Sequence, residues 1–281
     1  MPNIVYEKFT FSTPFLCGYR RLKIPIIDSD GCAAWPEVFP LEKIDEMRET
    51  VGPRHFSSQM MLQFVSPERV RLDPGAIKMY GDEFDARAGR LGDAVITGVS
   101  AYWDPSSGRR KSDGSVCVLV YRDDKNRRAY IHDVRYLVVD DNDTHPLGRQ
   151  CDMVLDFLAA HGLRRIAVET NGIGNALPEI IRDVAAKRAM PVSIQQISNS
   201  RNKELRILDA IEPMLTTGRL YAHSRVATTP LFAEMMGWSP IGAAGHDDGI
   251  DAVAGALSIT PAAIRTPTST GAYRANTDFN V

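Results

Sequence analysis

From about residue 93 onward, the apolar positions follow patterns that predict β-strands. Residues 93–103 form one apolar run that ends at Asp104, residues 115–121 form a second, and residues 128–139 alternate apolar and polar positions. Such runs are typical of buried strands. Short polar connections, as at residues 124–126, join consecutive strands and predict an antiparallel meander.

Helical and extended patterns then alternate along the chain. Helices are predicted at residues 147–161, 177–190, 203–215 and 248–259, and strands at residues 165–169 and 192–197. Three antiparallel strands followed by αβ units predict an α/β fold with a mixed central β-sheet and helices on both faces.

The N-terminal part lacks the regular apolar patterns of the rest of the chain. Residues 1–85 scatter Pro, Gly and aromatic residues, with a helix predicted over 41–51 that Gly52 and Pro53 should end, and a second helical stretch over 55–64. Such a segment wraps or links and does not build a core alone. The predicted organisation has three parts: a connector over 1–85, a compact domain over 86–265, and a Thr/Ser/Asn-rich flexible tail over 266–281.

Composition narrows the class of protein. The 281 residues are 44% hydrophobic and 24% charged, which is globular and not disordered composition. The net charge of −2 means that any contact with nucleic acid must come from local basic patches. Four scattered Cys without a CxxC pair argue against a zinc site and suit a reducing cytoplasm. The chain has no secretion signal and no run of ~18 apolar residues, so we expect no membrane segment.

Acidic residues lie at the ends of the predicted elements. Asp104 and Glu169 each end an apolar strand, and Asp248 and Asp251 share one face of the last helix, with Asp247 just before them. A desolvated carboxylate costs several kcal/mol unless it is paired or bound to metal, so buried strands rarely carry acids. In open sheets, functional groups gather at strand ends.

Converging carboxylates suit divalent cations. Two Mg²⁺ ions roughly 3.5–4 Å apart would stabilise the attacking and leaving oxygens of a displacement at phosphorus, which suggests phosphodiester hydrolysis. Each acid alone also suits an ordinary turn or helix cap. His246 and Asp113 fit either loop positions or auxiliary metal ligands. The order of the acids along the chain favours the metal site.

Several segments resemble the large terminase subunit of tailed bacteriophages. Its three acidic motifs are matched by residues 104–106, 166–172 and 246–252. Its Lys-containing segment is matched by residues 200–207, and the end of its ATPase region by residues 18–25 and 35–40. The resemblance covers about residues 15–260. It implies a ribonuclease H-like (RuvC-like) nuclease fold and Mg²⁺- or Mn²⁺-dependent cleavage of double-stranded DNA concatemers during genome packaging.

The resemblance also implies roles for single residues. Asp104 would bridge two metal ions, Glu169 would be the second acid, and Asp248 and Asp251 would be the ligands of the third motif. Asp247 stays open as a further ligand, because the helix start can shift by a residue. The resemblance also implies that Lys203 lies near the scissile phosphate, where its positive charge would balance negative charge.

One departure from the family concerns its motor. The sequence contains no GxxxxGK[ST] motif, so the chain resembles a terminase without its ATPase domain, which would belong to the same or a separate chain. We expect no ATP hydrolysis from it. The resemblance implies a small terminase subunit, the portal and the procapsid as partners, and the host cytoplasm as location.

Two basic groups are candidates for DNA contact. The first group is Arg109, Arg110 and Lys111; the second is Arg201 and Arg206, with Lys203 between them. Such groups position DNA through phosphates without reading sequence, and they also suit plain solvated surface. With the near-neutral charge, we expect weak, strongly salt-dependent binding of DNA and largely nonspecific cleavage.

Three other functions compete with this interpretation. A junction resolvase or an RNA–DNA hybrid nuclease has the same broad fold, although the N-terminal connector and the polar tail argue against both. An exonuclease with an Asp-x-Glu first motif is disfavoured because Ser106 follows Asp104 at that spacing. A non-catalytic docking module for DNA or the procapsid is the third, although all four core acids are present.

Overall fold

The structure is a computed structural model. It describes residues 5–7, 21–63, 72–106, 114–140, 142–171, 176–240 and 246–264. The chain forms two compact units, each built from separate stretches of sequence. The first unit contains Met1–Lys78, Arg201–Leu220 and Phe232–Asp247, and the second contains Met79–Ser200, Tyr221–Leu231 and Asp248–Val281.

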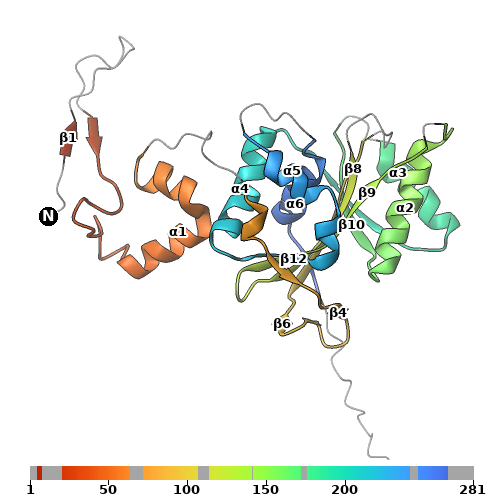
Figure 1. Cartoon of the computed structure of the whole chain (residues 1–281), viewed down its shortest axis with the longest axis horizontal. Coiled ribbons are helices and arrows are strands. Elements are labelled where there is room, and N and C mark those ends of the chain that lie inside the picture. The colour runs from red at the N-terminus through yellow and green to blue at the C-terminus, as the bar shows by residue number, and fades with distance from the viewer. Residues whose placement is uncertain are drawn as a thin grey trace, which may run out of the picture. The chain divides into compact units, whose positions relative to one another are not determined.

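The main element of the second unit is a mixed eight-stranded sheet, visible edge-on in Figure 1. Its path runs β11-β10-β7-β8-β9-β12-β3, and β13 pairs with β7 outside this path. The strands are β3 Lys78–Tyr80, β7 Gly98–Asp104, β8 Ser115–Asp123, β9 Arg128–Leu137, β10 Arg165–Glu169, β11 Ser193–Ile197, β12 Leu220–His223 and β13 Ala262–Ala263.

The directions of the strands confirm the predicted mixed sheet. β7, β8 and β9 pair antiparallel, whereas β10 runs parallel to β7 and β11 parallel to β10. β8 lies between β7 and β9 and is buried along almost its whole length. A strand buried on both faces needs a continuous apolar run, which is the pattern of its central residues 116–121.

Helices cover both faces of this sheet, as predicted. α2 Pro146–Ala160 and α3 Leu177–Lys187 pack over one face, where their apolar side chains share a core with Trp103 and Leu119. α6 Asp248–Ser258 packs against β7 and β8 from the other face (Figure 1). A helix that is apolar all round belongs in a protein interior, which fits the burial of residues 249–257.

The first unit contains the helices nearest the N-terminus. α1 runs over Leu41–His55 and continues past Gly52 and Pro53, so the predicted stop there is wrong. The helix ends two residues after Pro53, at His55. The π-helix η2 Phe56–Met60 follows it, within the helical stretch predicted over 55–64. α4 Lys203–Thr216 belongs to the same unit, and Arg219 just after it forms an ion pair with Glu49 of α1.

The remaining elements are short. They are β1 Val5–Glu7, β2 Arg21–Lys23, β4 Phe84–Asp85, β5 Arg90–Leu91, β6 Ala94–Val95, the 3-10 helices η4 Pro74–Ala76 and η6 Ser224–Thr228, and α5 Leu231–Gly237. The strand predicted over 93–103 is therefore two strands, β6 and β7. They separate because β6 pairs with β5 in a small sheet, whereas β7 enters the main one.

No helix in the described ranges has the length and apolar character needed to cross a bilayer.

Candidate functional site

The ends of two neighbouring strands bring Asp104 and Glu169 side by side. β10 and β7 run parallel, with Val168 paired with Trp103, and each strand ends one residue later at these acids. Adjacent strands lie about 4.8 Å apart. Because side chains alternate along a strand and Trp103 faces the α2–α3 core, both carboxylates belong to the face that α6 covers.

Glu169 is held by donors from both neighbouring strands. The Tyr102 hydroxyl donates to Glu169 Oε2 at 2.7 Å, and Asn199 Nδ2 donates to the same oxygen at 2.9 Å. Asn171 Nδ2 donates to Oε1 at 3.1 Å. Glu169 is only 9% exposed, and Tyr102 is 1% exposed. These three donors are neutral groups, and together they orient the carboxylate.

Asp248 reaches the same end of the sheet from the first turn of α6. The backbone N–H of Gly114 donates to Asp248 Oδ2 at 2.6 Å, and two residues later Val116 pairs with Asp104 across the sheet. A Cβ atom built at Gly114 would lie 2.9 Å from that oxygen, so a larger residue there would push the Asp248 carboxylate out of its place. Asp251, one turn further, is buried as well.

Lys203 and Asp247 pair with each other in the first unit. Lys203 Nζ lies 2.7 Å from Asp247 Oδ1, and both side chains are partly exposed. Asn202 caps the helix that begins at Lys203, because its side chain accepts the N–H of Leu205 at 2.9 Å. The structure therefore gives Asp247 a basic partner.

The candidate DNA contacts divide into two groups. Arg201 is exposed immediately before α4, and Arg206 lies in the first turns of that helix. The other group, Arg109, Arg110 and Lys111, falls outside the described residues, and so does Asp113. His246 is described and lies two residues before α6, on its exposed approach.

The acids fit a divalent cation by chemistry. Carboxylates from β7, β10 and α6 come to one sheet edge, and hard cations such as Mg²⁺ prefer oxygen ligands. Within the described part of the chain, however, no three His, Cys, Asp or Glu side chains are grouped closely enough to hold an ion. The ligand set of Asp104, Glu169, Asp248 and Asp251 therefore stays a prediction.

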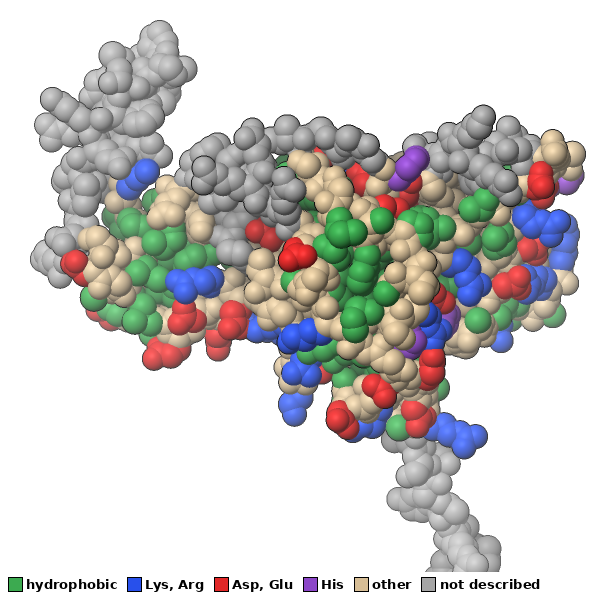
Figure 2. All heavy atoms as spheres, viewed as in Figure 1, with side chains coloured by type: hydrophobic (Ala, Val, Ile, Leu, Met, Phe, Trp, Pro, Cys, Tyr) green, Lys and Arg blue, Asp and Glu red, His purple; other side chains and the backbone are tan. Residues whose placement is uncertain are grey.

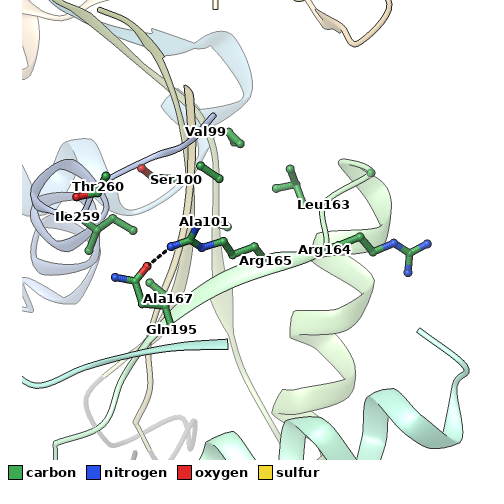
Figure 3. A pocket seen from close by; sticks show the side chains of 12 residues that line it. Val99, Ser100, Ala101, Leu163, Arg164, Arg165, Ala167, Gln195, Ile259 and Thr260 are labelled. Carbon is green, nitrogen blue, oxygen red and sulfur yellow. Dashed lines mark hydrogen bonds between the residues drawn. The ribbon is translucent and has the colours of Figure 1, made fainter. Parts of the chain in front are cut away.

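A pocket of about 270 Å³ lies at the opposite ends of the same strands, as Figure 3 shows. Val99 and Arg165 line it near the starts of β7 and β10, and Arg165 donates to Gln195 Oε1 at 2.8 Å. The acids at the far strand ends do not line this pocket.

The residues that hold the acids were not among those predicted from the sequence. Tyr102 could have been found, because it lies two residues before Asp104 and strand residues two apart share a face. Asn171 also lies near Glu169 in sequence. Asn199 and Gly114 gave no signal, because their partners are distant along the chain.

Comparison with known families gives one matching domain model. The model of the bacteriophage T7 terminase ribonuclease H-like domain matches residues 104–220. This match begins at the first candidate acid, contains Glu169 and Lys203, and ends before Asp248. It agrees with both the predicted family resemblance and the predicted fold. No curated protein sequence matches the chain.

Three of the solved structures that are similar to this chain have low sequence identity to it. The nuclease domain of the P22 large terminase has a TM-score of 0.48 and 13% identity over 68% of this chain and 93% of that one. The human cytomegalovirus terminase nuclease domain, soaked with manganese and bound to an inhibitor, has a TM-score of 0.42 and 18% identity over 56% and 80%. The RuvC protein of T. thermophilus, in complex with a Holliday junction, has a TM-score of 0.35 and 13% identity over 57% and 90%.

Proposed function

We propose that this chain, whose residues 104–220 match the terminase ribonuclease H-like domain, is a metal-dependent endonuclease of a viral DNA-packaging terminase. Its substrate would be double-stranded concatemeric DNA, cut by phosphodiester hydrolysis. The family match supports a nuclease. The observation that carries the proposal is the register of β7 and β10, which ends both strands in an acid at one edge.

The proposed metal ligands are Asp104, Glu169, Asp248 and Asp251, with Asp247 as a further candidate. Two bound Mg²⁺ or Mn²⁺ ions would supply charge stabilisation at the attacking and leaving oxygens of the phosphodiester. The protein's own part is to hold the carboxylates in place, which the donors to Glu169 and the Gly114 N–H to Asp248 already do. Carboxylates repel one another, so we expect them to draw together when the cations bind.

The basic residues would position the DNA. Lys203 would lie near the scissile phosphate, and five arginines and lysines would contact the backbone: Arg109, Arg110, Lys111, Arg201 and Arg206. Figure 2 shows Lys and Arg side chains in separate small groups, interspersed with Asp and Glu, over the face in view. Contacts of this kind are screened by salt, so affinity for DNA should fall steeply as ionic strength rises.

The remaining partners follow from the family. We propose that an ATPase domain on the same or a separate chain drives DNA movement, because this sequence has no P-loop. A small terminase subunit, the portal and the procapsid would select where the DNA is cut. The setting would be the cytoplasm of the infected host.

The test is a cleavage assay on supercoiled plasmid with Mn²⁺, Mg²⁺ or EDTA. The proposal expects nicked and linear products with a metal and none with EDTA. Plasmid left intact in both metals would favour a non-catalytic docking module. A synthetic four-way junction cut much faster than plasmid or linear duplex would favour a junction resolvase. Neither result is compatible with the terminase proposal.

A further inference from the structure

The carboxylate of Glu169 accepts hydrogen bonds from residues on both sides of its own strand. In the sheet, β10 lies between β7 and β11, so Tyr102 approaches Glu169 from one neighbour and Asn199, two residues after β11, from the other. Asn171 completes this Glu169 network: its Nδ2 donates to Glu169 Oε1 and to the backbone carbonyl of Asn199, at 3.1 and 2.7 Å.

Tyr102 also contacts the helix that carries the other acids. A Cβ atom built on Gly255 of α6 would lie 2.4 Å from Cε1 and Cζ of the Tyr102 ring. Only a glycine therefore allows α6 to pass so close to this ring. Asp248 and Asp251 lie at the start of the same helix. A single buried tyrosine thus contacts the helix of the third acidic motif and donates to the acid of the second.

From this geometry we propose that Tyr102 and Asn199 are positioning residues that set the affinity of the site for its divalent cations, acting through Glu169. This inference rests on the proposed nuclease function. Both donors bind Glu169 Oε2 and so hold the carboxylate in one orientation. Partners that orient a metal ligand are typically worth about 10–100-fold in metal affinity.

The main test compares two tyrosine variants. Tyr102→Phe removes the hydroxyl that donates to Glu169, whereas Tyr121→Phe removes a hydroxyl from an equally buried ring on β8, away from the acids. Mn²⁺ binding is measured by isothermal titration calorimetry without DNA, and plasmid nicking is measured across a Mn²⁺ series. For Tyr102→Phe we expect binding weaker by about 10–100-fold, with the rate restored to within about threefold at saturating Mn²⁺. The control should match the wild type in both.

Two further variants perturb the same network from other sides. Asn199→Ala removes the second donor to Oε2, and Gly255→Ala forces the Tyr102 ring away from its place. Both should weaken Mn²⁺ binding in the same direction as Tyr102→Phe. Melting temperatures in EDTA identify any variant that is simply unfolded. Tyr102→Phe itself keeps the ring and its packing, so it should fold.

Two results would overturn the inference. One is a Tyr102→Phe protein that binds Mn²⁺ as tightly as the wild type. The other is a slower rate at every Mn²⁺ concentration with unchanged binding, since this would give the hydroxyl a role outside metal affinity. A wild-type protein that neither binds Mn²⁺ nor cuts DNA would instead remove the nuclease proposal itself, so the two failures are distinguishable.

Discussion

Two regions of the second unit bring acidic side chains together, and the hydrogen-bond partners seen at these acids differ. The first is a histidine cluster of His132, His161 and His223. The ring centroid of His132 lies 5.6 Å from that of His161 and 5.1 Å from that of His223. Its acids have basic partners. Asp133 Oδ2 lies 2.8 Å from Nε2 of His161, and Glu83 forms an ion pair with Arg225.

The second region is the edge where Asp104, Glu169 and Asp248 lie. There a phenol and two amides donate hydrogen bonds to Glu169, and Asp248 accepts a backbone N–H. The donors seen at the acids are therefore histidine and arginine in the first region and neutral groups in the second. If the acids at the strand ends bind metal, variants there should change cleavage, whereas variants in the histidine cluster should change stability.

The largest expected effect is on cleavage. Glu169→Gln keeps an oxygen that can accept from Tyr102 but removes the charge, and Asp104→Asn does the same on the neighbouring strand. We expect each variant to lose cutting by at least about 10²–10³-fold, because charge stabilisation at the reacting phosphate is the main source of rate. Initial rates of plasmid nicking in Mn²⁺ measure this, with melting temperature as the check on folding.

The structure decides between possible variants of Glu169. Glu169→Ala would leave the buried hydroxyl of Tyr102 and the amide of Asn199 without this acceptor, at a cost of about 1–3 kcal/mol. That cost works against any gain in stability from relieving repulsion between acids. Glu169→Gln avoids the ambiguity. If it nicks plasmid at the wild-type rate, Glu169 has no part in the chemistry and the contrast between the two regions fails.

The next effect should appear in stability and leave cleavage unchanged. Burial alone would raise the pKa of Asp133, but the hydrogen bond from His161 and the nearby charges of His161, Arg135 and His132 together lower that pKa below its usual value. Asp133→Asn removes this pairing inside the histidine cluster, and we expect a loss of about 2–3 kcal/mol in unfolding free energy. Urea unfolding measures it, beside the nicking assay.

An exposed acid provides the control for this variant. Asp152 pairs with Arg188 at 3.6 Å at the surface, and Asp152→Asn should cost under about 1 kcal/mol. A nicking rate that falls as far in Asp133→Asn as in Glu169→Gln would show that the two regions do not have separate roles.

A smaller effect is expected for Lys203. Its ion pair with Asp247 is partly exposed, so Lys203→Ala should change stability by less than about 1 kcal/mol. If Lys203 offsets charge at the scissile phosphate, the nicking rate should fall about tenfold while affinity for DNA falls much less. Arg201→Ala, beside it, should change affinity alone. Equal losses of rate and affinity in Lys203→Ala would make it a plain phosphate contact.

Local patterns in the sequence predicted what local interactions determine. β10 and the start of α6 lie where their apolar runs indicate, and so both Glu169 and Asp248 were found at element ends. The missing parts depend on distant contacts. β3 and β12 enter the sheet only through tertiary pairing, and Tyr102 meets Glu169 across 67 positions of the chain.

The smallest expected effect is a pH dependence confined to the histidine cluster. Burial, followed by the charges of His161 and His223, lowers the pKa of His132 to about 4. Nδ1 of His132 lies 2.9 Å from the Tyr80 hydroxyl, and Nε2 lies 3.3 Å from Glu83. Because a carboxylate accepts, Nε2 carries the proton and Nδ1 accepts from Tyr80. The buried ring is therefore neutral in the folded protein.

The sign of this dependence follows from where the proton binds. The unfolded chain takes up a proton on His132 near its usual pKa of about 6.5, whereas the folded protein does so only near 4, so stability is full above 6.5 and falls as pH falls. Between pH 7.5 and 6 we expect a loss of about 1 kcal/mol. His132→Gln should flatten this slope, whereas His145→Gln, at the exposed position just before α2, should keep it. An unchanged slope in His132→Gln would mean that another group titrates.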